Sequence, residues 1–238
     1  MNLPAVTLFH GWGYTPALWQ KLTMALPDFD CHAPRLLAPE AGIEEWADAQ
    51  ATSLPDHGLL VGWSLGAMLA YTIAARHPAK VRGLILLAGS PLMRNEAAWP
   101  NGLDADLLEK FSQGFRQAPE RTMRRFLALQ LVGDSHPLKA RHLLEASLDD
   151  VARHHDALEH GLRILFSTDL RDTALPPGLP LRLIHGRRDE VMPVAGSEWL
   201  HRRYPDSRLL ILEEAGHAPL LAEPEILATH IRALHDAA

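Results

Sequence analysis

The chain has 238 residues, of which 47% are hydrophobic and 22% are charged, and its formal net charge is −6. These values are typical of an ordinary globular protein and argue against a general affinity for nucleic acid or anionic membranes. The N-terminus has no basic region, and the apolar run at residues 5–9 is too short for a signal-peptide core or a membrane span. We therefore expect a cytoplasmic protein with no nucleic-acid or membrane partner.

Short apolar runs alternate with helical patterns through the first 93 residues. The β-rich runs predict strands at 6–9, 58–62 and 81–88, and the spacing of apolar residues predicts helices at 16–26, 44–53 and 65–76. This alternation is typical of a parallel sheet covered by helices on both faces. The first part of the chain is therefore predicted to have an α/β fold.

The pattern changes after residue 93 and returns after residue 169. Residues 94–169 contain no β-branched runs and show several helical patterns, which predicts an all-helical cap insertion. Further strands are predicted at 181–184 and 209–212, with helices at 194–204 and 225–235. We expect one α/β core made of residues 1–93 and 170–238, with a mostly parallel sheet, and a cap made of residues 94–169.

The segment Gly62-Trp63-Ser64-Leu65-Gly66 matches the G-x-S-x-G nucleophile elbow. In this motif, small residues on both sides of the serine allow a strand and a helix to meet at a strained turn. An apolar strand precedes the motif here and an Ala-rich helix follows it. Ser64 is therefore predicted to be the nucleophile.

A serine nucleophile needs a base that is itself oriented by a third group. His217 lies in a glycine-containing loop directly after the predicted strand 209–212, and Asp189 lies in the loop that follows the predicted strand 181–184. The order Ser64, Asp189, His217 is the order of the α/β-hydrolase triad. Glu190 is the alternative acid, although the spacing of this loop to Pro193 favours Asp189.

The tetrahedral intermediate of such a reaction needs two N–H donors for its oxyanion. The elbow supplies one of them from the residue after the nucleophile, which is Leu65. The loop His10-Gly11-Trp12-Gly13 contains glycines that allow the backbone to turn toward the site, and Trp12 is predicted to supply the second. A glycine turn packed by the Trp12 side chain is the alternative, and the two are compatible.

With these motifs, nearly the whole chain resembles the α/β-hydrolase superfamily. HGWG, GWSLG, Trp99-Pro100, Arg125-Phe126-Leu127-Ala128-Leu129-Gln130 and Thr168-Asp169-Leu170-Arg171 together resemble the pimeloyl-[acyl-carrier protein] methyl ester esterases of biotin synthesis. The resemblance implies a carboxylesterase with an acyl-carrier protein as partner. It also implies a set of substrate-binding residues, namely Trp12, Ser64, Leu65, Phe126, Leu127, Ala128, Leu129, Gln130 and His217.

In the same family, arginines of the insertion bind the acidic carrier protein. The residues that can form such a patch here are Arg121, Arg124, Arg125, Lys139 and Arg141. Glu120, Asp134 and Glu145 are interleaved with them, so a solvated helix face is the alternative. Packing of a helix in the core is likewise the alternative for Phe126, Leu127 and Leu129.

The sequence therefore predicts a serine carboxylesterase that hydrolyses the methyl ester of pimeloyl-[acyl-carrier protein]. A broad esterase, thioesterase or C–C hydrolase acting on free small molecules is one alternative. A hydrolase-fold protein that binds a ligand without turnover is another. No metal or nucleotide motif is present, the reaction requires neither, and a monomer without cofactors is expected.

Overall fold

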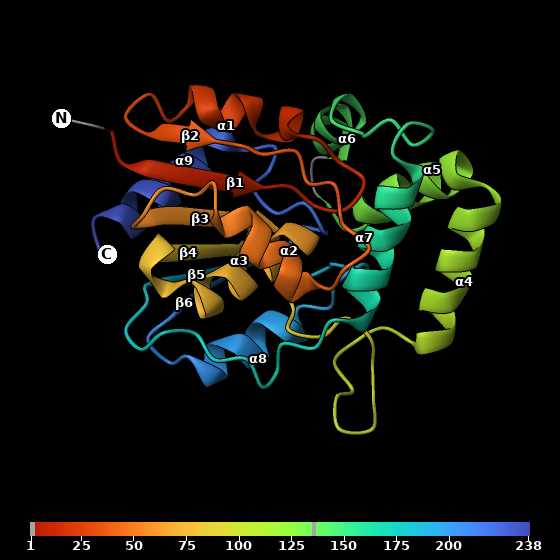
Figure 1. Cartoon of the computed structure of the whole chain (residues 1–238). Coiled ribbons are helices and arrows are strands. Elements are labelled where there is room, and N and C mark those ends of the chain that lie inside the picture. Colours follow the sequence, from red (N-terminus) through yellow and green to blue (C-terminus); the bar gives the residue numbers. More distant parts are fainter. Residues whose placement is uncertain (1–2, 135–136) are drawn as a thin grey trace.

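A computed structural model describes residues 3–134 and 137–238, and its centre is a sheet of six parallel strands (Figure 1). The spatial order is β2-β1-β3-β4-β5-β6. The strands are β1 Ala5–Phe9, β2 Asp30–His32, β3 Gly58–Trp63, β4 Val81–Leu87, β5 Leu181–Gly186 and β6 Arg208–Leu212. The predicted α/β fold is confirmed.

Helices cover both faces of this sheet. The elements of the core are η1 Pro16–Trp19, α1 Gln20–Met24, α2 Ile43–Ala51, α3 Leu65–Arg76, η2 Pro78–Lys80, α8 Ala195–Arg203 and α9 Pro224–His235. In Figure 1, α2 and α3 lie in front of the sheet, whereas α9 lies behind it. The helix predicted at 16–26 is split into η1 and α1, because the chain begins as a 3-10 turn at Pro16.

The central strands β3 and β4 consist almost entirely of buried apolar residues, as a strand covered on both faces requires. The edge strand β2 differs from them. Its sequence, Asp30-Cys31-His32, contains no apolar run, and only its pairing with β1 makes it a strand. The sequence analysis missed β2 because an edge strand carries little of the hydrophobic pattern on which such a prediction depends.

Four helices lie between β4 and β5, beyond the carboxyl ends of the strands (Figure 1). They are α4 Ala105–Gln117, α5 Pro119–Gln130, α6 Pro137–Ala146 and α7 His155–Ser167. Where the chain leaves and re-enters the core, Leu92 forms a bridge with Asp169, and the Leu170 N–H donates to the carbonyl of Pro91 (2.8 Å). This closure supports 94–169 as the proposed extent of the cap. Across residues 3–134 and 137–238, no helix combines the length and apolar character that crossing a membrane requires.

Candidate active site

Ser64 lies at the sharp turn between β3 and α3, with a φ of 56°. This left-handed conformation is strained for a residue with a Cβ. A Cβ at position 62 would collide with the backbone of Gly66, and one at position 66 would collide with the backbone of Phe9. Only glycine fits at both positions. The close backbone contacts at Gly62 and Gly66 let the turn hold Ser64 at the carboxyl edge of the sheet.

His217 links Ser64 to Asp189 in one chain of hydrogen bonds. Its Nε2 lies 3.0 Å from Ser64 Oγ, and its Nδ1 lies 2.8 Å from Asp189 Oδ2. All three side chains are buried. Because the ionised carboxylate only accepts, Nδ1 carries the proton of the neutral imidazole, and Nε2 is free to accept from the serine hydroxyl. The three predicted residues thus meet in the geometry of a nucleophile, its base and an orienting acid.

Asp189 is held as a carboxylate by its surroundings. Burial alone would raise the pKa of Asp189, but the charges and hydrogen bonds of His217 and His185 outweigh burial and hold this pKa below its usual range. The backbone N–H groups of Val191 and Met192 each donate to Oδ1 at 2.8 Å. Its neighbour Glu190 is exposed and, in the described part of the chain, has no hydrogen bond to His217.

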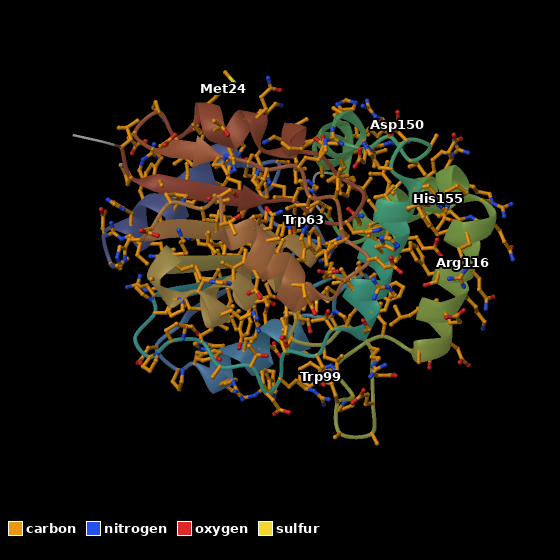
Figure 2. All side chains as sticks on the ribbon, in the orientation of Figure 1. Met24, Trp63, Trp99, Arg116, Asp150 and His155 are labelled. Atoms are coloured by element: carbon orange, nitrogen blue, oxygen red, sulfur yellow. The ribbon has the colours of Figure 1, made fainter. Side chains whose placement is uncertain are left out.

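The loop that carries His217 is fixed by contacts from two sides. The Trp63 Nε1–H donates to the carbonyl of His217 (2.7 Å), and the N–H of His217 donates to the carbonyl of Gln130 (3.3 Å). Trp63 lies deep in the interior, at the end of β3 (Figure 2). Through Gln130, the position of the base depends on the cap as well as on the core.

Two backbone N–H groups are predicted to form the oxyanion hole, those of Leu65 and Trp12. Leu65 is the first residue of α3, and Trp12 lies in the loop after β1. Within the described residues, neither N–H donates to another protein atom. His10 holds the loop of Trp12, since its Nε2 accepts from the N–H of Leu36 (3.0 Å) and its Nδ1 therefore donates to the carbonyl of Gly11 (2.9 Å).

An apolar cavity of about 80 Å³ lies between the Trp12 loop and the cap. Its lining residues include Trp12, Phe111, Phe126, Leu129 and Phe166. The Trp12 ring meets the rings of Phe111 and Phe126 edge to face, at centroid distances of 5.8 and 5.2 Å. Its Nε1–H donates to the carbonyl of Leu158 on α7 (2.7 Å). The cavity can therefore receive an apolar chain, and Glu190 is the one carboxylate among the described residues that line it.

The segment 126–130 presents its side chains in different directions. Phe126 and Leu129 line the cavity, Leu127 is buried in the core, and Ala128 is exposed. The Gln130 side chain is fully buried, and its Oε1 accepts from the Tyr14 hydroxyl (2.9 Å). Of the side chains predicted to bind substrate in this segment, those of Phe126 and Leu129 therefore face the cavity.

The five basic residues of the predicted patch divide into two groups. Arg121, Arg124 and Arg125 are exposed on α5, at the spacing of one helix face, and have no ion pair within the described residues. Lys139 instead forms an ion pair with Glu223 (2.6 Å). Arg141 forms another with Glu145 (2.8 Å). Among these five residues, those without a counter-ion therefore all lie on α5.

The sequence analysis missed one side chain that contacts the site. His185, the penultimate residue of β5, is fully buried, and its Nε2 lies 3.1 Å from Asp189 Oδ2. The available signal was its position near the end of a strand whose residues are all buried, where a polar side chain needs a partner. Nothing in the sequence indicated that this side chain contacts Asp189, because the contact depends on the path of the loop after β5.

A parallel sheet whose carboxyl edge holds a hydrogen-bonded serine, histidine and aspartate is the arrangement of the α/β serine hydrolases. The family described as alpha/beta hydrolase fold matches residues 4–224. A solved structure of an esterase from Exiguobacterium antarcticum has the same fold, with a TM-score of 0.80 at 21% identity over 98% of this chain and 92% of its own.

Curated relatives define the family more narrowly. A pimeloyl-[acyl-carrier protein] methyl ester esterase of Aromatoleum aromaticum is 40% identical over 97% of this chain and 98% of its own length. The esterase of the same name from Aeromonas hydrophila is 36% identical over 93% of this chain and 91% of its own. The chain therefore belongs to the α/β-hydrolase fold family and, within it, to the pimeloyl-[acyl-carrier protein] methyl ester esterases.

Proposed function

We propose that this protein is a serine carboxylesterase that hydrolyses the methyl ester of pimeloyl-[acyl-carrier protein], a step of biotin synthesis. The observation that carries the chemistry is the hydrogen-bonded chain from Ser64 through His217 to Asp189. An apolar cavity lined by Trp12 and by Val191 of the Asp189 loop accompanies it. The substrate is the one named for the relatives from Aromatoleum aromaticum and Aeromonas hydrophila.

In the first half of the reaction, His217 Nε2 takes the proton of Ser64 as Oγ attacks the ester carbonyl. The N–H groups of Trp12 and Leu65 stabilise the oxyanion, and Asp189 stabilises the imidazolium. The tetrahedral intermediate then collapses. The C–O bond to the methoxy group breaks, His217 returns the proton to this group, and methanol leaves an acyl-serine ester.

In the second half, water attacks the acyl-serine carbonyl while His217 Nε2 takes a proton from the water. Collapse of this intermediate breaks the bond to Ser64 Oγ, which recovers the proton from His217. The products are the free carboxylate of the acyl chain and the regenerated serine. The proton exchanged between Ser64 Oγ and His217 Nε2 moves between atoms that already lie 3.0 Å apart in the resting site, and the reaction uses no cofactor.

The cavity beside Trp12 is proposed to receive the methylene chain of the substrate. Phe126 and Leu129 contribute apolar walls at the junction of α5 with the core. Burial of a methylene group contributes about 0.8 kcal/mol, so several methylenes distinguish an acyl chain from a short ester. The proposed contact of Phe126 with the acyl chain is compatible with its packing, because Phe126 lines the cavity while its ring also packs against Trp12 and Phe111.

The exposed arginines of α5 are the proposed docking site for the acidic carrier protein. Arg121, Arg124 and Arg125 have no partner among the described side chains and can each pair with a carboxylate. Lys139 and Arg141 contribute less in this proposal, because each would first have to break an existing ion pair. We further propose that the enzyme acts as a cytoplasmic monomer, since one chain supplies every residue of the site.

Hydrolysis of p-nitrophenyl butyrate and labelling by a fluorophosphonate test the serine chemistry. The wild-type protein should hydrolyse this ester and gain the mass of one phosphonyl group. The Ser64→Ala variant should lose at least a thousandfold in kcat and remain unlabelled, because the nucleophile is absent. Substantial turnover by this variant would overturn the assignment, and a wild-type protein that neither hydrolyses nor is labelled would indicate a binding protein.

A further inference from the structure

His185 is a buried polar group that the reaction described above does not use. It is the penultimate residue of β5, and its side chain has no exposed surface. Its two ring nitrogens face different elements. Nε2 lies 2.7 Å from the carbonyl of Met192 and 3.1 Å from Asp189 Oδ2, whereas Nδ1 lies 2.7 Å from the hydroxyl of Ser197 on α8.

The location of the protons follows from the partners. A carbonyl and a carboxylate only accept, so Nε2 carries a hydrogen that it shares between Met192 and Asp189. The Ser197 hydroxyl lies within 3.0 Å of the carbonyl of Gly89 as well as near His185. It either donates to Nδ1 of a neutral ring, or accepts from Nδ1 of a charged ring and donates to Gly89. In both states, Nε2–H is shared between the nearer carbonyl of Met192 and Asp189 Oδ2.

This hydrogen bond completes the set of donors around the acid. Oδ1 receives the N–H groups of Val191 and Met192, and Oδ2 receives Nδ1–H of His217 together with Nε2–H of His185. A carboxylate offers about four acceptor sites, and all are used here. The two histidines therefore compete for the negative charge of the same oxygen.

We propose that His185 is a positioning residue for the acid of the triad: by donating to Asp189 Oδ2, it fixes this carboxylate and limits the negative charge that His217 experiences. The proposal rests on the proposed esterase function. Charge at Asp189 favours the protonated form of His217, which cannot accept the proton of Ser64. A donor that shares this charge keeps His217 available as a base at lower pH.

The groups that surround this acid in the described part of the chain come from several elements. His185 and His217 are the ionisable side chains that influence Asp189 most strongly. Val191 and Met192 contribute N–H groups from its own loop, whereas Ser197 and Gly89 contribute neutral groups from α8 and from the segment after β4. A change in the pH dependence of activity after substitution of His185 can therefore be assigned to its contact with Asp189.

The test is the pH profile of kcat/KM for p-nitrophenyl butyrate in the variants His185→Leu and His185→Gln. Leucine removes the donor, so the acid limb should move to higher pH by about one unit, and kcat at neutral pH should fall about tenfold with little change in KM. The amide of glutamine can still donate to Asp189, so His185→Gln should keep the acid limb near that of the wild type.

A second variant and a control distinguish loss of the contact with Asp189 from misfolding. Ser197→Ala removes a single oxygen from the partner of Nδ1 and should shift the acid limb in the same direction by a smaller amount. His201→Leu is the matched control, because His201 also pairs with a serine hydroxyl, that of Ser207, and does not contact Asp189. Its profile should equal that of the wild type.

The outcomes distinguish the positioning role of His185 from the proposed esterase function. Folded His185→Leu and Ser197→Ala variants with a wild-type acid limb would overturn the positioning role, even if their stability fell, because a merely structural histidine would not set the pH dependence. A wild-type protein without esterase activity would instead overturn the proposed function on which this role rests.

Discussion

Burial determines the charge of His10, the residue that holds the loop of Trp12 through its contacts with Gly11 and Leu36. Removal from water lowers the pKa of His10 to about 4, and the hydrogen bond to Gly11 offsets only part of this effect. The ring is therefore neutral near pH 7. This agrees with its contacts, since Nε2 can accept from the N–H of Leu36 only while it carries no proton.

The low pKa of His10 predicts a loss of stability in mild acid. The unfolded chain has a histidine pKa of about 6.5, so it binds a proton before the folded chain does as the pH falls. The free energy of unfolding should decrease between about pH 6.5 and 4, by a His10 contribution on the order of 3 kcal/mol. Urea unfolding from pH 7 to 4 measures it. His10→Gln should flatten this decrease, and an equally steep decrease in the variant would contradict the assignment.

Asp189 and Glu190 are adjacent carboxylates that should contribute differently to kcat. Asp189→Asn removes the acceptor for Nδ1–H of His217 and should lower kcat by about 10³- to 10⁴-fold, as loss of the correct tautomer does in serine hydrolases. Glu190→Gln should change kcat only a few-fold. Steady-state kinetics on p-nitrophenyl butyrate compares them. A larger loss of kcat in the Glu190 variant would indicate that Glu190, and not Asp189, is the acid of the triad.

Spacing in the sequence favoured Asp189 over Glu190, and the hydrogen bond to His217 agrees with that choice. The contact of His185 with Asp189 could not be predicted in the same way. The two residues are only four positions apart, but the contact depends on how the loop folds back over the end of β5. Local sequence does not encode this path.

At the scale of the elements, the elbow between β3 and α3 depends on two glycines. Gly66→Ala places a methyl group against the backbone of Phe9 and His10, neither of which can move without distorting β1. We expect this variant to lose about 3 kcal/mol of unfolding free energy and most of its activity.

Gly58→Ala is the matched control for the elbow. A Cβ at the start of β3 meets its nearest atoms at 3.6 Å, which is ordinary contact, and the residue needs no positive φ. Thermal unfolding and ester hydrolysis should therefore remain close to those of the wild type. Equal losses in the two variants would show that the elbow has no special steric requirement.

The elements themselves were largely predictable where the period of apolar residues was clear. The helix predicted at 65–76 has the same bounds in the structure, and the strand predicted at 58–62 extends by only one residue. The strand β2 was not predictable, because Asp30-Cys31-His32 becomes a strand only by pairing with β1. Whether such a segment forms an edge strand depends on its tertiary contacts, which a single sequence does not show.

At the scale of the whole molecule, the cap and the core share one site. The core supplies Ser64, Asp189 and His217, whereas α5 supplies the carbonyl that receives the N–H of His217. The same helix lines the apolar cavity and exposes three arginines. A carrier protein bound to α5 would therefore dock close to the cavity proposed for its acyl chain. The residue types of α5 were visible in the sequence, but the ion pair that Lys139 of α6 forms with the distant Glu223 was not.

Carrier-dependent recognition is tested by the kcat/KM for pimeloyl-carrier-protein methyl ester, measured beside that for p-nitrophenyl butyrate. We expect a strong preference for the carrier-bound ester. Replacing Arg121, Arg124 and Arg125 together by alanine should raise KM for this ester about 10- to 100-fold and leave the free ester unaffected, whereas Lys139→Ala with Arg141→Ala should have a smaller effect. A preference for the free ester, or an equal effect of the three arginines on both esters, would contradict carrier-dependent recognition and leave a general esterase.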